Sequence, residues 1–168
     1  LQALVGPPET DAVLDLADDL LESFPTHPAA EFARLYTLRA TSYGTRHGDL
    51  DEAWAVATDL ILHTDDALVL SQAIGVLATI PGDKVLDGPT LDAIADVLDH
   101  HDDLVDPLDV SVFALNQSLK RDDAQRARDW VTRFEHHLDT FCPHGRTDPR
   151  CSMQYDNLNH ATAYIADI

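Results

Sequence analysis

Basic residues are scarce in this sequence. Its 168 residues contain 11 Lys and Arg against 30 Asp and Glu, for a net charge of −19, and only two of the bases are Lys. A surface of that sign disfavours direct binding to the backbone of DNA or RNA. The sequence also lacks a run of about 18 apolar residues and a basic-then-apolar leader. We therefore expect neither a membrane span nor a signal peptide.

The acidic residues, 25 of them Asp, are spread over the whole chain. Such a surface repels itself in dilute buffer, whereas salt at about 1 M shortens the screening length to about 3 Å. We interpret this composition as adaptation of a cytoplasmic protein to a salt-loaded cell. Mimicry of nucleic acid, or capture of a basic partner, is the alternative, but it predicts acids clustered in one patch or tail.

The few bases, in contrast, are clustered. Seven of the 11 fall between residues 120 and 150, where six acidic residues nearly balance them. This neutral-to-basic island could receive an acidic partner or an anionic ligand. Ion pairs between neighbouring helices would produce the same pattern, and we favour them. The seven bases are Lys120, Arg121, Arg126, Arg128, Arg133, Arg146 and Arg150.

Apolar residues recur at spacings of three and four, which is typical of amphipathic helices. The pairs Asp106–Pro107 and Asp148–Pro149 each place an N-cap candidate before a proline suited to the first helical position. We predict a single all-α domain over residues 1–168, and we expect it to be part of a longer chain because it begins with Leu1. Eight helices are expected, over residues 10–24, 29–46, 50–63, 66–79, 89–100, 107–119, 122–141 and 149–166.

A repeat is visible in four of these helices. Ala12, Ala53, Ala93 and Ala127 each lie near the start of a helix, at spacings of 41, 40 and 34 residues. A small residue at that place lets two helices approach closely, as an antiparallel helix pair requires.

The segment RLYTLRATSYGTRHGDLDEAWAVATDLILHTDDA, residues 34–67, resembles a tetratricopeptide repeat. Its turn GDLDEA (48–53) and Ala57 match the family pattern, and RDDAQRA (121–127) is a weaker echo. The resemblance implies a right-handed superhelix of stacked antiparallel helix pairs, with a compact helical bundle as the alternative. Three positions depart from the family pattern. The family usually has Trp or Leu where this chain has Thr37, Tyr where it has Gly44, and Pro near Asp65.

The resemblance also implies a function. In such arrays the first helix of each pair lines a groove that binds an extended peptide or a partner helix. Those helices would be 29–46, 66–79, 107–119 and 149–166. We predict a non-catalytic interaction domain with a protein or peptide partner and without cofactor or metal. The candidate groove residues, whose polar groups can hydrogen-bond a peptide, are Arg34, Tyr36, Arg39, Tyr43, Gln72, Asn116, Gln117, Tyr155 and Asn157.

Both cysteines lie in FCPHGRTDPRC, residues 141–151. Cys142, His144 and Cys151 are of the types that bind zinc, but the paired C-x2-C motifs of a strong zinc signature are missing. A disulfide is sterically plausible, although a reducing compartment argues against it. A thiolate at Cys151 would be favoured by a helix N-terminus and by Arg150. We favour a simple connection in which Pro and Gly residues end one helix and begin the next.

Two other classes of function stay open. The stretch ADVLDHHDD, residues 95–103, faintly resembles the His-Asp doublet of the HD phosphohydrolases, which hold a metal and activate water. The doublet would be His101 and Asp102, with His63 or His47 upstream, but the small residues that follow it in that family are replaced. A metal-dependent hydrolase is therefore the first alternative, and a structural subunit of a homo-oligomer is the second.

Overall fold

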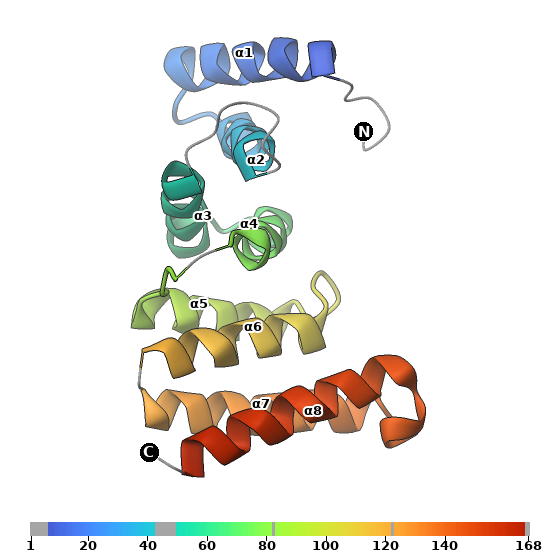
Figure 1. Ribbon diagram of the computed structural model, residues 1–168. Helices are drawn as coiled ribbons and strands as arrows, with labels where there is room; N and C mark the ends of the chain where they lie inside the picture. Colours follow the sequence, from blue (N-terminus) through green and yellow to red (C-terminus); the bar gives the residue numbers. More distant parts are fainter. Residues whose placement is uncertain (1–6, 43–49, 82, 122, 167–168) are drawn as a thin grey trace. The chain divides into compact units, whose positions relative to one another are not determined.

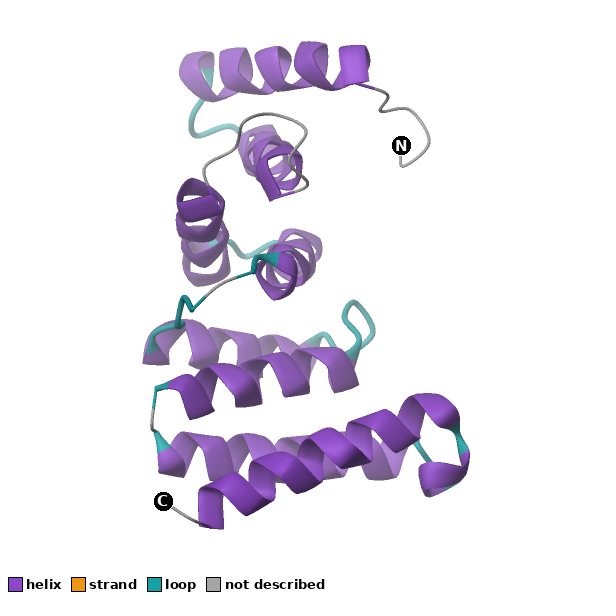
Figure 2. Ribbon diagram, viewed as in Figure 1, coloured by secondary structure: helices purple, strands orange, loops and turns teal. Residues whose placement is uncertain are grey.

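The computed structural model describes residues 7–42, 50–81, 83–121 and 123–166, and all regular structure in these ranges is helical (Figures 1 and 2). The eight predicted helices are confirmed, most with ends within one or two residues of those expected. The elements are α1 (Pro7–Ser23), α2 (Pro28–Ser42), α3 (Leu50–His63), α4 (Ala67–Thr79), α5 (Gly88–His100), α6 (Pro107–Lys120), α7 (Ala124–Phe141), the short 3-10 helix η1 (Gly145–Thr147) and α8 (Pro149–Ala166).

Aspartate caps the start of four of these helices. The side chains of Asp66, Asp87, Asp106 and Asp123 accept hydrogen bonds from backbone N–H groups in the first turns of α4 to α7. The expected Asp106–Pro107 start is confirmed, since the carboxylate accepts from the N–H of Leu108 at 3.1 Å. Asp therefore contributes to helix starts as well as to surface charge.

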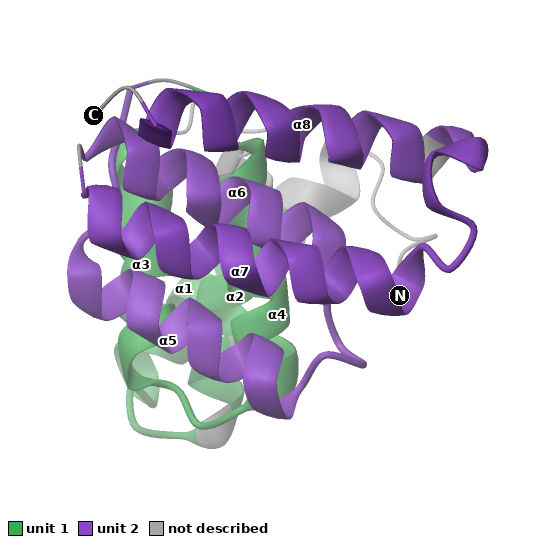
Figure 3. Ribbon diagram, turned by 90° about the horizontal axis from the view of Figure 1, so that it is seen from below, with its two compact units in different colours: residues 1–82 green, residues 83–168 purple. Residues whose placement is uncertain are grey.

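The chain divides into two compact units, residues Leu1–Gly82 and Asp83–Ile168, which are coloured separately in Figure 3. In the first unit, α2 contacts α1, α3 and α4, and α3 contacts α4. Small side chains lie between these helices, because Ala53, Ala57 and Ala73 are at most 1% exposed. Of the four repeat positions, Ala53 and Ala127 are buried, whereas Ala12 is exposed and Ala93 is half-buried, so the prediction of a packed small residue holds at two of them.

The second unit contains α6, α7 and α8 in mutual contact, together with α5. Its core centres on α7, where Trp130, Phe134 and Leu138 recur every four residues and are buried. The repeat position Ala127 lies one turn earlier and is also buried. This buried apolar face packs α7 into the unit, although the rest of its sequence is strongly polar.

Ion pairs join α7 to α5. Arg126 pairs with Asp92, and Arg133 pairs with Asp99. The partners are seven residues apart on each helix, about two turns, so α5 and α7 run parallel and in register. The bonded guanidinium of Arg133 lowers the pKa of Asp99, and the bonded carboxylate of Asp92 raises the pKa of Arg126. For these bases, the interpretation of the basic island as interhelical ion pairs is confirmed.

A part-buried polar contact joins α6 to α7. The Ser111 hydroxyl lies 2.8 Å from Nδ1 of His137. Burial lowers the pKa of His137, and the neighbouring His136 and Arg133 lower it further, which favours the neutral ring. Because Ser111 is fully buried, we assign this pair to helix packing and not to nucleophilic chemistry.

Candidate functional site

A hollow of about 240 Å³ lies between α6 and α8 in the second unit. Two of the predicted groove residues, Asn116 and Asn157, line it together although they are 41 residues apart in the sequence. We call it the α6–α8 hollow. Its lining residues are Asn116, Leu119, Asn157, His160, Ala161 and Tyr164.

Helical spacing places these side chains on common faces. On α8, Asn157, His160, Ala161 and Tyr164 follow the i, i+3, i+4, i+7 pattern of one helix face. Tyr164 is 47% exposed, whereas Ala161 is buried beneath it. His160 and Tyr164 were not among the predicted groove residues. Their spacing from Asn157 was the signal that could have identified them.

A chain of hydrogen bonds holds the hollow in shape. The buried side chain of Gln154 donates to Asp109 of α6 at 3.1 Å. The side-chain amide of Asn157 in turn donates to the side-chain oxygen Oε1 of Gln154, also at 3.1 Å. The Asn116 amide has no hydrogen bond to any other residue in the described ranges. The hollow therefore contains two side-chain amides. That of Asn157 is held in position by Gln154, and that of Asn116 is available to bond a ligand.

The neighbouring Gln117 is buried in the core instead. It is 5% exposed, and its side-chain oxygen accepts a hydrogen bond from the backbone N–H of Leu86 at 3.0 Å. Arg121 donates to the Leu86 carbonyl oxygen at 2.9 Å. These bonds tie the segment before α5 to α6. Because the Gln117 side chain is buried by them, the prediction of Gln117 as a groove residue does not hold. Asn116 is exposed, whereas Gln117, the next residue of α6, faces the core.

The other predicted groove residues lie apart from this hollow. Tyr155 is half-buried under the guanidinium of Arg146, whose carbon is 5.5 Å from the ring centroid. In the first unit, Tyr36 is 36% exposed on α2 and Gln72 is half-buried on α4. Arg39 belongs to α2, but its side chain lies outside the described set, as does the whole of Tyr43.

Arg34 belongs to a second hollow, in the first unit. Its guanidinium pairs with Asp59 of α3 at 3.1 Å. The hollow has a volume of about 440 Å³ and is also lined by Glu31, which accepts a hydrogen bond from Thr64. Arg34 and Glu31 therefore already have bonding partners, Asp59 and Thr64, outside the lining of this hollow.

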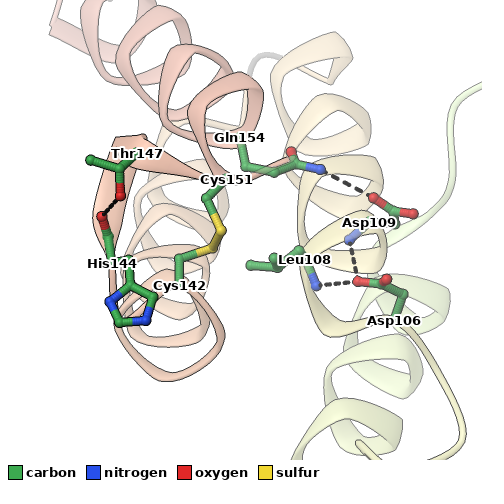
Figure 4. Close-up of a disulfide and its surroundings, with 8 residues drawn as sticks. All are labelled: Asp106, Leu108, Asp109, Cys142, His144, Thr147, Cys151 and Gln154. Carbon is green, nitrogen blue, oxygen red and sulfur yellow. Dashed lines mark hydrogen bonds between the residues drawn. A yellow bond between two sulfur atoms is a disulfide. The ribbon is translucent and has the colours of Figure 1, made fainter. Parts of the chain in front are cut away.

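The stretch 141–151 contains a disulfide, which corrects the prediction of a simple connection. Cys142 at the end of α7 and Cys151 in the first turn of α8 are covalently joined, with their Cα atoms 5.9 Å apart (Figure 4). Both cysteines are 3% exposed. Between them, Gly145 adopts a φ of +58°, a left-handed conformation that glycine accommodates without strain. The turn thus brings the two sulfur atoms together.

Because both sulfur atoms are in the disulfide, Cys142 and Cys151 cannot join His144 as zinc ligands. For the same reason, Cys151 is not a reactive thiol. Within the described ranges, no three His, Cys, Asp or Glu side chains are grouped so that they could hold a metal ion. The hydrolase candidate His101 caps the C-terminus of α5, and His63 pairs with Asp59. His47 is outside the described residues.

Comparisons of the chain with models of protein families, with curated proteins and with solved structures found no match. What the structure itself defines is an all-α protein of eight described helices, in which consecutive helices pack together within each unit. Among the described helices, none has the length and apolarity needed to cross a membrane.

Proposed function

We propose that this protein is a non-catalytic interaction domain that docks an extended segment of a partner protein in the α6–α8 hollow. The observation that carries the proposal is the convergence of Asn116 and Asn157 from two helices on one hollow. The tetratricopeptide-like segment at 34–67, and with it a superhelical arrangement of the helix pairs, supports the same function by resemblance. In each unit one helix contacts both the next helix and the one after it, as stacked pairs do.

The chemistry of the hollow suits a polypeptide backbone. An Asn side chain carries both a donor and an acceptor, and can pair with the N–H and C=O of one peptide unit. Leu119 and Ala161 add apolar surface, and Tyr164 adds a rigid ring with a polar tip. Among the described residues, no Asp, Glu, Lys or Arg lines the hollow. Recognition there would depend on backbone shape and hydrogen bonding more than on charge.

Substituting one of the two amides tests this proposal. We expect Asn157→Ala to weaken binding of short mixed-sequence peptides by about tenfold, because about 1.4 kcal/mol of hydrogen bonding is lost. An immobilised peptide array would identify binders, and fluorescence anisotropy would then give their Kd values. The matched control is Asn159→Ala, since Asn159 is exposed on the same helix but does not line the hollow.

Two results would reject the docking function. The first is that no peptide in the array binds with a Kd below about 1 mM. The second is that Asn157→Ala and Asn159→Ala change the affinity equally, because binding would then depend on α8 in general and not on this hollow.

We also propose that the acidic surface adapts the domain to high salt. Unfolding should become less favourable as KCl rises from about 0.1 M to about 1 M, which shortens the screening length from about 10 Å to about 3 Å. The exposed ion pairs also weaken, but each contributes only about 0–1 kcal/mol, against the self-repulsion of 19 net charges. Urea titrations at each KCl concentration would measure the change, with sucrose as the uncharged control. A flat or falling free energy of unfolding would reject this adaptation.

A cytoplasmic location remains a prediction. The disulfide counts against a strongly reducing cytosol, because disulfides persist mainly in oxidising compartments. Assay of the free thiols in protein taken directly from its cells would decide between these environments.

A further inference from the structure

We propose that the Cys142–Cys151 disulfide is a redox-sensitive cross-link that controls the docking site. In the oxidised protein it holds the first turns of α8 in place, and its reduction releases them and dismantles the α6–α8 hollow. The effect on docking rests on the function proposed above, whereas the release of α8 stands independently of it.

Apart from the disulfide, the first half of α8 is held mainly by polar contacts, such as the ion pair of Asp156 with Arg146 at 2.9 Å, and by few apolar ones. Between residues 149 and 157 the only buried side chains in the described set are Cys151 and Gln154, while Met153 is 60% exposed. The first large buried aliphatic residue of the helix is Leu158. On α7, by comparison, three large buried residues anchor the helix over its length. The disulfide therefore substitutes for the apolar contacts that this part of α8 lacks.

The disulfide is linked to the hollow through successive turns of α8. Cys151, Gln154 and Asn157 are spaced by three residues, so each lies about one turn from the next. Gln154 bonds to Asp109 of α6, and Asn157 bonds to Gln154. Figure 4 shows Gln154 reaching α6 one turn beyond the disulfide. If the turn at Cys151 opens, Gln154 loses its register with α6, and Asn157 loses its position in the hollow.

A reductant has a route to the sulfur atoms. Another hollow, of about 340 Å³, is lined by Cys151 and by Leu108, whose side chain points toward the disulfide in Figure 4. Asp102, Asp106 and Asp148 also line it. Carboxylates at that place repel reductants that carry acidic groups of their own, so the hollow favours a dithiol without carboxylates.

The reaction is a thiol–disulfide exchange with a dithiol as the reductant. One thiolate of the dithiol attacks the sulfur of Cys151, the S–S bond breaks, and Cys142 leaves as a thiolate that takes up a proton. The second thiol of the reductant then displaces Cys151 and forms the cyclic disulfide. In total, two electrons and two protons pass to the protein, and the dithiol is oxidised.

Hydrogen exchange read by mass spectrometry, with and without excess dithiothreitol, tests the release of α8. We expect amides of residues 152–157 to exchange roughly 100-fold faster in the reduced protein, which corresponds to the entropy of opening a loop of about ten residues. Amides of α6 and α7 should change by less than about threefold. The Cys142→Ala/Cys151→Ala variant should exchange like the reduced protein whether or not dithiothreitol is present.

The same samples, tested with the best peptide from the array, separate the two proposals. Faster exchange in α8 with loss of peptide binding on reduction supports control of docking. Unchanged exchange in α8, or equally faster exchange in α6 and α7, overturns the local cross-link. Faster exchange in α8 with unchanged binding overturns the control of docking. Faster exchange in α8 in a protein that binds no peptide even when oxidised supports the release of α8 and rejects the docking function.

Discussion

Replacing Phe134 with Ala should lower the free energy of unfolding of the second unit by about 3–5 kcal/mol. Phe134 is fully buried in the middle of α7, between Trp130 and Leu138, and α7 contacts both α6 and α8. The substitution removes a large apolar side chain and leaves a cavity where three helices meet. Since the stability of a domain is typically about 5–15 kcal/mol, this single change removes a large fraction of it.

The two tryptophans allow the second unit to be followed separately. The chain has only Trp54, in α3, and Trp130, in α7. In a Trp54→Phe background, the fluorescence of Trp130 during urea unfolding reports on the second unit. Glu135→Ala is the matched control, because Glu135 is the exposed neighbour of Phe134 on the same helix. A loss below about 1 kcal/mol for Phe134→Ala would contradict the packing of α7 described here.

The Cys142→Ala/Cys151→Ala variant should unfold about 2.5 kcal/mol more easily than the oxidised protein. The two cysteines are nine residues apart, and closing a loop of that length removes about this much entropy-derived free energy from the unfolded chain. Urea unfolding followed at Trp130 would measure the change. The loss concerns global unfolding, and so differs from the local opening of α8 that hydrogen exchange detects.

Reduction of the natural protein provides the control for this variant. If the cross-link acts on the unfolded chain, the reduced protein and the double variant should lose nearly the same free energy. A much larger loss in the variant would assign the effect to packing around the buried sulfur atoms. No difference between oxidised and reduced protein would show that the disulfide contributes nothing to global stability.

The positions of the helices were predictable because their signals are local. A stripe such as Trp130, Phe134 and Leu138 follows from a period of 3.6 residues, and an Asp–Pro pair such as Asp106–Pro107 marks a helix start. These signals involve residues within one or two turns of each other. The prediction that bases of the island form interhelical ion pairs also held for Arg126 and Arg133. Their partners, Asp92 and Asp99, lie outside the island, 34 residues earlier in α5.

The site was predictable only in part. Asn116 and Asn157 were identified by residue type and by the helices that carry them, yet the same criteria selected Gln117, which is buried. The type of a side chain does not show whether its position on α6 faces the core or the solvent. His160 and Tyr164 were missed although their spacing places them on one helix face with Asn157, because only the packing of α6 against α8 makes that face line the hollow.

The sequence alone therefore determined the all-α class, the helix boundaries, the acidic surface and the polar character of the candidate site. These properties depend on composition and on contacts a few residues long. Only the tertiary structure decided that Cys142 and Cys151 are bonded and that Asn116 and Asn157 share one hollow. The physical reason is that both depend on how separate segments are placed in space. A short turn sets the distance between the sulfur atoms, and the packing of α6 against α8 sets the distance between the amides.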